Sequence, residues 1–103
     1  MSKSLLDTRK GVCFMCGKYG PTEKHHIFGS YNRKKSEEDG LYVYLCHSCH
    51  NEPPDGVHFN KRKMQRLHVA GQSRWEMVKI IQDGMTDEEA RMAFMERYGK
   101  NYL

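Results

Sequence analysis

The alternation of apolar and polar positions predicts two short strands in the first half of the chain. Residues 24–28 (KHHIF) and residues 41–45 (LYVYL) combine aromatic, β-branched and alternating character, which favours strands. In the second strand Leu41, Val43 and Leu45 would share one face. Residues 29–40 between the strands are polar and bounded by Gly residues, and this pattern predicts a long loop.

Helical spacing replaces alternation in the second half of the chain. Small or apolar residues at intervals of three or four predict one long helix from Val57 to about Gln82, with Gly84 as its stop signal. The stripe consists of Met64, Leu67, Gly71, Trp75 and Val78. Thr86 and Glu89 have the form of a capping box for a shorter second helix. The stripe of that helix would be Ala90, Phe94 and Tyr98.

The chain has 103 residues and contains no repeat, low-complexity tract or Ser/Gly linker. It therefore predicts a single domain over residues 1–103, with a core at about 11–82 and a C-terminal helical extension at 83–103. A chain this short buries only about 60 to 65% of its unfolded surface, so it needs support besides apolar packing. It has no apolar run of the roughly 18 residues that span a membrane, and no apolar stretch typical of a secretory signal. A reducing cytoplasm is the expected location, which argues against disulfides.

The four cysteines form two C-x-x-C pairs, Cys13 with Cys16 and Cys46 with Cys49, separated by 29 residues. Two thiolates on a tight turn can face one ion, and two such turns complete the tetrahedron that Zn²⁺ prefers. Free thiols and a redox pair are the alternatives, but no βαβ pattern surrounds either pair. The pattern favours structural zinc, and a closed four-thiolate site does not hydrolyse substrates.

The histidines are the candidates for catalysis, which a closed cysteine site does not perform. His25 and His26 are adjacent on the first predicted strand, and His50 and His58 follow the second. Neighbours on a regular strand point to opposite faces, so a shared site would require a bulge or a twisted strand end. Without the rest of the chain, the preferred interpretation of two adjacent histidines on a strand is one ring packed in the core and one ring in solvent. His47 and His68 are expected at solvated positions.

The order of these features resembles the HNH nucleases of the ββα-metal class. The chain is similar to small phage and prophage HNH-type proteins over nearly its whole length, except residues 69–90. The stretches that carry the resemblance are Glu23–Phe28, Asn32–Ser36, Gly40–Cys46, Gly56–Asn60 and Gly99–Leu103. The resemblance implies a small α+β fold with a zinc-stabilised, treble-clef-like ββα-metal core.

By that resemblance, His25 ligates a catalytic divalent metal and His26 is the general base of a one-metal mechanism. A neutral imidazole can take a proton from an attacking water at pH 7, while a cation such as Mg²⁺ or Mn²⁺ offsets charge on the phosphate. His50 has the motif position of the further metal ligand. Pro53, Pro54 and Gly56 prevent a helix directly after it, so His58, in the first turn of the delayed helix, is expected to face the site as well.

The sequence departs from the motif at its middle Asn, which orients the base. That residue normally lies nine positions before the His after the second C-x-x-C, and Leu41 occupies this position here. Asn32 is the candidate substitute and Asn60 the second choice. A backbone carbonyl could also orient His26.

Basic side chains flank the expected site. The net charge is +4, and residues 57–82 carry six basic side chains and one acidic side chain. A charge run is usually a solvated face, but beside a phosphodiester site it becomes a candidate for phosphate contacts. The candidates are Arg33, Lys34, Lys35, Lys61, Arg62, Lys63 and Arg66.

Together these features predict a metal-dependent DNA endonuclease acting on duplex or branched DNA. A catalytically inactive, zinc-stabilised module that binds DNA or protein is the alternative, because the missing Asn would permit a decayed site. A redox or metal-sensing switch is a third possibility and would require labile cysteines.

Overall fold

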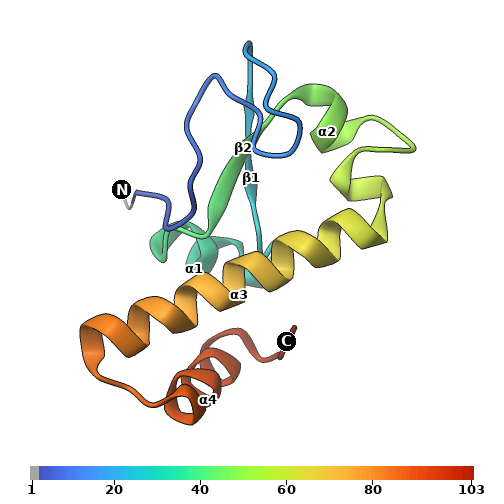
Figure 1. The fold of residues 1–103 in the computed structure, drawn as a ribbon. Helices are drawn as coiled ribbons and strands as arrows, with labels where there is room; N and C mark the ends of the chain where they lie inside the picture. Colours follow the sequence, from blue (N-terminus) through green and yellow to red (C-terminus); the bar gives the residue numbers. More distant parts are fainter. Residues whose placement is uncertain (1–2) are drawn as a thin grey trace.

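The computed structural model describes residues 3–103 as a small α+β protein with a two-stranded sheet and four α-helices within that range (Figure 1). The elements are β1 (Glu23–His26), α1 (Arg33–Glu38), β2 (Tyr42–Leu45), α2 (His47–Asn51), α3 (Lys61–Asp83) and α4 (Asp87–Tyr98), with 3₁₀ turns at Ser30–Asn32 and Val57–Phe59. The long α3 passes across one end of the β1–β2 hairpin, and α4 folds back beneath it (Figure 1).

The two strands pair antiparallel in a regular register that runs from Glu23 opposite Leu45 to His26 opposite Tyr42. Both strands were expected from the sequence, and the predicted inward face of the second one, Leu41, Val43 and Leu45, is fully buried. The N-terminal segment crosses the outer edge of β2, where Ser4 Oγ donates to the Tyr42 carbonyl at 2.7 Å.

The expectation of a loop over residues 29–40 is wrong, because a 3₁₀ turn and the helix α1 occupy most of this segment. Ser36 explains how a polar stretch becomes ordered. Its buried hydroxyl donates to the Leu41 carbonyl and accepts from the Phe28 amide at 3.2 Å, so α1 is tied to the ends of both strands. Gly40, with φ of +72°, then reverses the chain into β2.

The long helix begins at Lys61, four residues after the predicted start at Val57. The residues from Val57 to Phe59 form a 3₁₀ turn, and α3 starts at Lys61 after Asn60, whose side chain accepts from the Lys63 amide at 3.0 Å. A loop after His50 was predicted, and α2 does end at Asn51, before the two prolines. The central stripe residues Leu67, Gly71 and Trp75 are buried, whereas Met64 and Val78 are half-buried.

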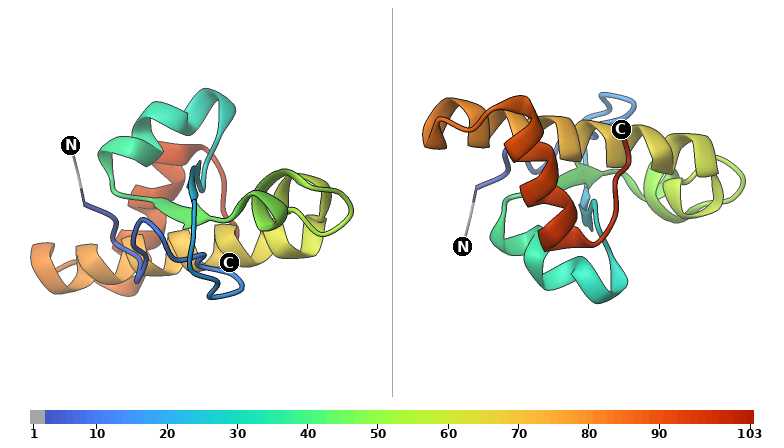
Figure 2. Two further views of the ribbon diagram at one scale, coloured as in Figure 1. Left: turned by 90° about the horizontal axis from the view of Figure 1, so that it is seen from above. Right: turned by 90° about the horizontal axis from the view of Figure 1, so that it is seen from below.

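The two C-terminal predictions about helix ends are confirmed. Gly84 terminates α3 in the left-handed conformation, and Thr86 with Glu89 forms the expected capping box of α4. The buried stripe of α4 consists of Ala90, Phe94 and Tyr98. The helix lies beside α3 (Figure 2), and the Phe94 and Trp75 rings have centres 5.5 Å apart. Within residues 3–103, no helix combines the length and the apolar character that a membrane crossing needs.

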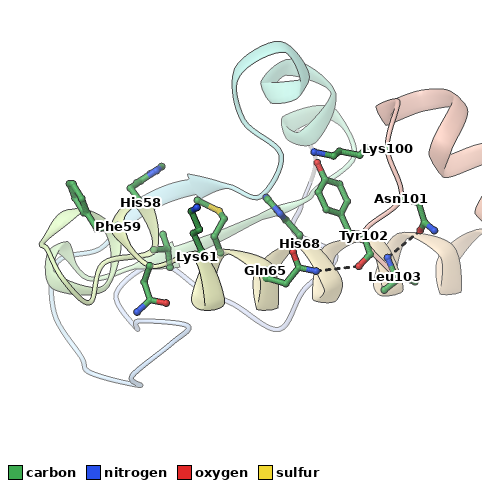
Figure 3. Close-up of a pocket in the computed structure, with 12 residues that line it drawn as sticks. His58, Phe59, Lys61, Gln65, His68, Lys100, Asn101, Tyr102 and Leu103 are labelled. Carbon is green, nitrogen blue, oxygen red and sulfur yellow. Dashed lines mark hydrogen bonds between the residues drawn. The ribbon is translucent and has the colours of Figure 1, made fainter.

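Close packing fixes α3 against the end of the hairpin. A Cβ at Gly71 would lie 2.9 Å from Ile27 Cγ2, so only glycine allows the helix to approach this closely. After α4, the chain runs back along α3, where Tyr102 lies beside His68 with ring centres 4.4 Å apart (Figure 3). The core therefore includes residues from Leu6 near one end of the chain to Tyr98 near the other.

Candidate metal centres

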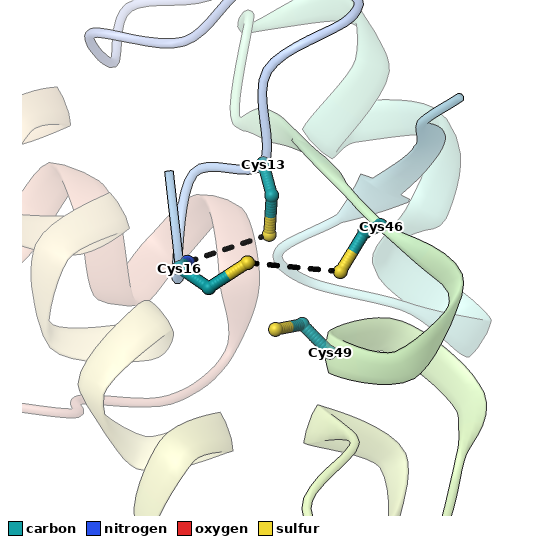
Figure 4. Close-up of side chains that lie close together, drawn as sticks. All are labelled: Cys13, Cys16, Cys46 and Cys49. Atoms are coloured by element: carbon teal, nitrogen blue, oxygen red, sulfur yellow. Dashed lines mark hydrogen bonds between the residues drawn. The ribbon is translucent and has the colours of Figure 1, made fainter. Parts of the chain in front are cut away.

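The four cysteine side chains point toward one common centre (Figure 4). Their sulfurs all lie within 4.8 Å of one another, and Cys16 Sγ is 3.8 Å from Cys46 Sγ. Two sulfurs bound to one Zn²⁺ at about 2.3 Å in a tetrahedron would be about 3.8 Å apart. The cluster therefore has the donor set and the spacing of a structural metal site, as the sequence predicts.

The sheet brings the two C-x-x-C pairs together. Cys13 and Cys16 lie on a tight turn closed by the Gly17 amide, which donates to the Cys13 carbonyl at 2.9 Å. The Phe14 amide donates to the Tyr44 carbonyl at 2.8 Å, which anchors this turn on β2. Cys46 follows the end of β2 directly, and α2 carries Cys49. The 29 residues between Cys16 and Cys46 therefore contain the β1–β2 hairpin.

Backbone N–H groups favour a thiolate at Cys13. Burial raises the pKa of this thiol, but hydrogen bonds from the backbone N–H groups of Cys16, Cys46 and Met15 outweigh burial and lower the pKa to about 6. Burial and the neighbouring sulfurs raise the pKa of Cys49. A cation among the four sulfurs is what would let all of them ionise together.

A second cluster consists of three histidines from three different elements. His25 comes from β1, His50 from α2 and His58 from the 3₁₀ turn before α3, and one ring nitrogen of each lies within 4.8 Å of the others. The Nε2 atoms of His50 and His58 are 3.0 Å apart. Nitrogens about 2.1 Å from one ion and at right angles about it would also be about 3.0 Å apart.

The buried member of this cluster lacks a partner. His25 is 3% exposed, and its Nε2 is buried with no hydrogen-bond partner within the described part of the chain. Burial, and then the neighbouring histidines, lower the pKa of His25 to about 3, so its ring is neutral. Burial also lowers the pKa of His58. Neutral imidazoles are the form that binds metals, so this donor set fits a divalent cation.

Glu23 orients one of the three rings, and sequence reasoning did not identify it. One carboxylate oxygen lies 2.8 Å from His50 Nδ1 and the other lies 2.9 Å from His47 Nδ1. A carboxylate only accepts, so His50 carries its proton on Nδ1 and offers the lone pair of Nε2 to the cluster. These two histidines in turn lower the pKa of Glu23. His47 is exposed as expected, but its ring is paired with the Glu23 carboxylate.

His26 lies beside the cluster and has a different set of partners. Its Nε2 is 2.6 Å from Glu37 Oε1, and Arg33 Nε donates to its Nδ1 at 3.4 Å. Because the carboxylate accepts and the guanidinium donates, both neighbours favour the same hydrogen-bonding arrangement, in which Nε2 donates and Nδ1 accepts. Glu37 has its pKa lowered by His26 and then by Lys24.

Of the two arrangements expected to bring His25 and His26 to one site, the structure has a strand end and not a bulge. Their strand pairing is regular, yet both rings line one cavity of about 290 Å³ together with His50, His58 and Arg33. β1 ends at His26, and the following turn, with Ser30 at φ of +50°, closes the cavity from the other side. A strand end can therefore place neighbouring rings at one site.

Neither asparagine considered as a partner for His26 has a hydrogen bond to that ring. Asn32 Nδ2 donates to the Tyr98 carbonyl at 3.0 Å, and Asn60 caps α3. Glu37 holds the ring instead, and it was missed because it lies on a helix that the sequence did not predict. The expectation of a solvated His68 is also wrong, since its ring is half-buried and stacks on Phe28.

The candidate phosphate contacts differ in their exposure and in their partners. Lys35 Nζ donates to the Arg97 carbonyl at 2.9 Å, and Lys63 Nζ donates to the Asp55 carbonyl at 2.9 Å, so both have structural partners. Arg33 touches His26 as described. The exposed members of the set are Arg33, Lys34, Lys61, Arg62 and Arg66.

Comparison with known proteins adds no relative. No protein-family model, no curated protein and no solved structure matches the chain. The functional argument therefore rests on the two side-chain clusters and their surroundings.

Proposed function

We propose that the protein is a metal-dependent DNA endonuclease of the HNH type, with His26 as general base. The observation that carries the proposal is the convergence of ring nitrogens from three histidines, His25, His50 and His58, beside a fourth histidine whose ring is held by Glu37. Such a set of mutually oriented histidines lining one cavity is typical of a catalytic site.

The three-histidine cluster would hold the catalytic cation, and the four cysteines would hold a separate structural zinc. When bound, the cation at the histidines would stabilise negative charge on the phosphate and on the leaving oxygen. Imidazole accommodates several divalent metals, so the ligands alone leave the choice among Mn²⁺, Mg²⁺ and others to experiment.

His26 would act on water. The lone pair on Nδ1 accepts a proton from the water that attacks phosphorus, and the ring becomes an imidazolium. The Glu37 carboxylate, 2.6 Å from Nε2, stabilises that positive charge and keeps the ring from rotating. The proton later leaves to solvent, and no covalent intermediate is needed.

Arg33 would change partners when substrate binds. In the free protein its Nε donates to the same Nδ1 that must receive the proton. A phosphodiester is a stronger acceptor for a guanidinium than a neutral ring nitrogen, so the side chain would transfer to the phosphate and release the base. The exposed Lys34 and Lys61 would contact neighbouring phosphates along the strand.

A plasmid-nicking assay with Mn²⁺ or Mg²⁺ tests the proposal. His26→Ala should lower the rate by about 100-fold or more, because a base acts on the transition state, while zinc content and DNA affinity stay near those of the unmodified protein. Lys79→Ala, on the far part of α3, is the matched control. A folded, zinc-loaded protein that binds DNA but nicks nothing with either metal would reject the proposal in favour of a non-catalytic binding module.

A further inference from the structure

A groove of about 670 Å³ extends from the histidine cluster along the first half of α3 (Figure 3). Its floor is α3, and its far wall is the C-terminal segment Lys100–Leu103. The groove adjoins a second cavity of about 340 Å³ that is lined by His25 and His26, since His58, Met64, His68 and Tyr102 line both. A ligand at the histidines could therefore continue into the groove.

The wall formed by residues 100–103 is held in place from within the core. Gln72 on α3 is fully buried, and its side chain accepts from the Tyr102 amide at 2.7 Å and donates to Asn101 Oδ1 at 2.9 Å. The Tyr102 ring stacks on Phe28 with ring centres 5.1 Å apart. The groove is thus formed before any ligand arrives, which lowers the entropic cost of binding.

The lining combines aromatic rings with positive charge. Phe59 is 56% exposed at the end near the histidines, and the rings of His68 and Tyr102 lie farther along (Figure 3). Lys61 and Lys100 are exposed at the opening, and no Asp or Glu side chain is among the lining residues. Planar apolar faces flanked by cations suit a ligand with flat rings and negative charges.

We propose that this groove binds an unpaired nucleotide of the DNA strand whose phosphodiester lies at the histidine centre; this rests on the proposed function. The base would stack on Phe59, and its flanking phosphates would contact Lys61 and Lys100. A base inside a duplex keeps its faces covered by its neighbours, whereas an unpaired base can stack on an aromatic side chain. The preferred substrates are then branched, flapped or overhanging DNA rather than uninterrupted duplex.

Binding without added divalent cation tests the groove separately from catalysis. The probe is a short oligothymidine with one central 2-aminopurine, whose fluorescence falls on stacking, used either single-stranded or annealed to its complement. The unmodified protein should bind the single strand more tightly and quench its fluorescence. Phe59→Ala should weaken single-strand binding by about 5- to 150-fold and abolish the quenching, with little change for the duplex. Tyr19→Ala, which removes an exposed aromatic ring from the first cysteine turn, is the control.

A second variant keeps the test decisive if Phe59→Ala is poorly folded. Lys100→Ala removes a charge from an exposed position, and it should reduce the slope of log affinity against log salt by about 0.7 for the single strand. Equal affinity for single strand and duplex, or unchanged binding in both groove variants, would overturn the proposal. Groove binding with no metal-dependent nicking would instead reject only the proposed activity.

Discussion

Glu37 Oε1 on α1 lies 2.6 Å from Nε2 of His26, the last residue of β1. The contact assigns a role to α1, which otherwise consists mainly of solvated charges. Under the proposed function, this carboxylate would take the base-orienting role of the motif asparagine, whose position Leu41 occupies.

Replacing Glu37 by Gln should lower kcat for plasmid nicking by about 10- to 100-fold with little change in KM, because the carboxylate orients the base without touching DNA. Glu37→Asp should recover part of the loss. The neighbouring Glu38→Gln is the comparison. An equal rise in KM and fall in kcat, with no recovery by Asp, would mean that Glu37 only supports the fold.

Cys16 provides the cleanest test of the cysteine centre, because it is the exposed member and its loss leaves no core cavity. Cys16→Ser should remove tightly held zinc and lower the thermal midpoint, since structural zinc contributes folding free energy directly. Metal analysis and calorimetry measure both effects, with Lys18→Ser on the same turn as control. Less than about half an equivalent of zinc in the folded unmodified protein would contradict the site.

The histidine centre should lose its ion before the cysteine centre does. A low concentration of EDTA should stop nicking while zinc remains bound, and Mn²⁺ or Mg²⁺ should restore it, because imidazole and water hold hard cations weakly. His25→Ala, His50→Ala and His58→Ala should each raise the metal concentration at half-maximal rate. If only one of the latter two variants does so, the Nε2 atoms that lie 3.0 Å apart do not share an ion.

Stability should fall in mild acid because of His25. Its pKa is about 3 in the folded protein and about 6.5 when unfolded, so below pH 6.5 the unfolded state takes up a proton that the folded state refuses. Without added divalent cation, the unfolding free energy should drop by about 1 kcal/mol between pH 7.5 and 5.5 from this residue, and the loss should level off near pH 3. Urea titrations of the unmodified protein and His25→Leu measure the difference. Parallel pH curves for the two proteins would rule out this contribution.

Asp39 should be the most sensitive polar position outside the two centres. It accepts from Trp75 Nε1 at 3.0 Å, from Arg97 Nε at 2.6 Å and from the Tyr98 hydroxyl at 2.6 Å, and so joins the end of α1 to both long helices. Asp39→Ala should cost roughly 2 to 4 kcal/mol, because it leaves three donors unpaired. Urea unfolding measures this loss, and Glu38→Ala is the neighbouring control.

Local chemistry explains which elements the sequence could predict. The capping box at Thr86 and the stop at Gly84 depend on a few adjacent residues, and the buried face of β2 depends on simple alternation. Each C-x-x-C pair is likewise a local pattern of four residues, and the chain contains two of them. Such features need no knowledge of the rest of the fold.

Distant contacts explain what the sequence could not predict. Asp39 at the end of α1 is held by Trp75 on α3 and Arg97 on α4, which lie 36 and 58 positions away in the chain. Glu23 was missed for the same reason, since it meets His50 across 27 positions. Carboxylates that orient histidines leave no periodic pattern, so only the folded arrangement identifies them.

The short helix α2 carries Cys49 and His50 as neighbours, and so one turn of backbone serves both clusters. Unfolding of this turn, for example after oxidation of the thiols, would displace Cys49 and His50 together and so disrupt both centres. If an ion at one centre orders this turn and so favours the other centre, thermodynamic reciprocity makes the gain in affinity equal in both directions. Under the proposed function, an ion at the histidines would then raise the affinity of the cysteines for zinc, and loss of zinc would weaken metal binding at the unchanged histidines.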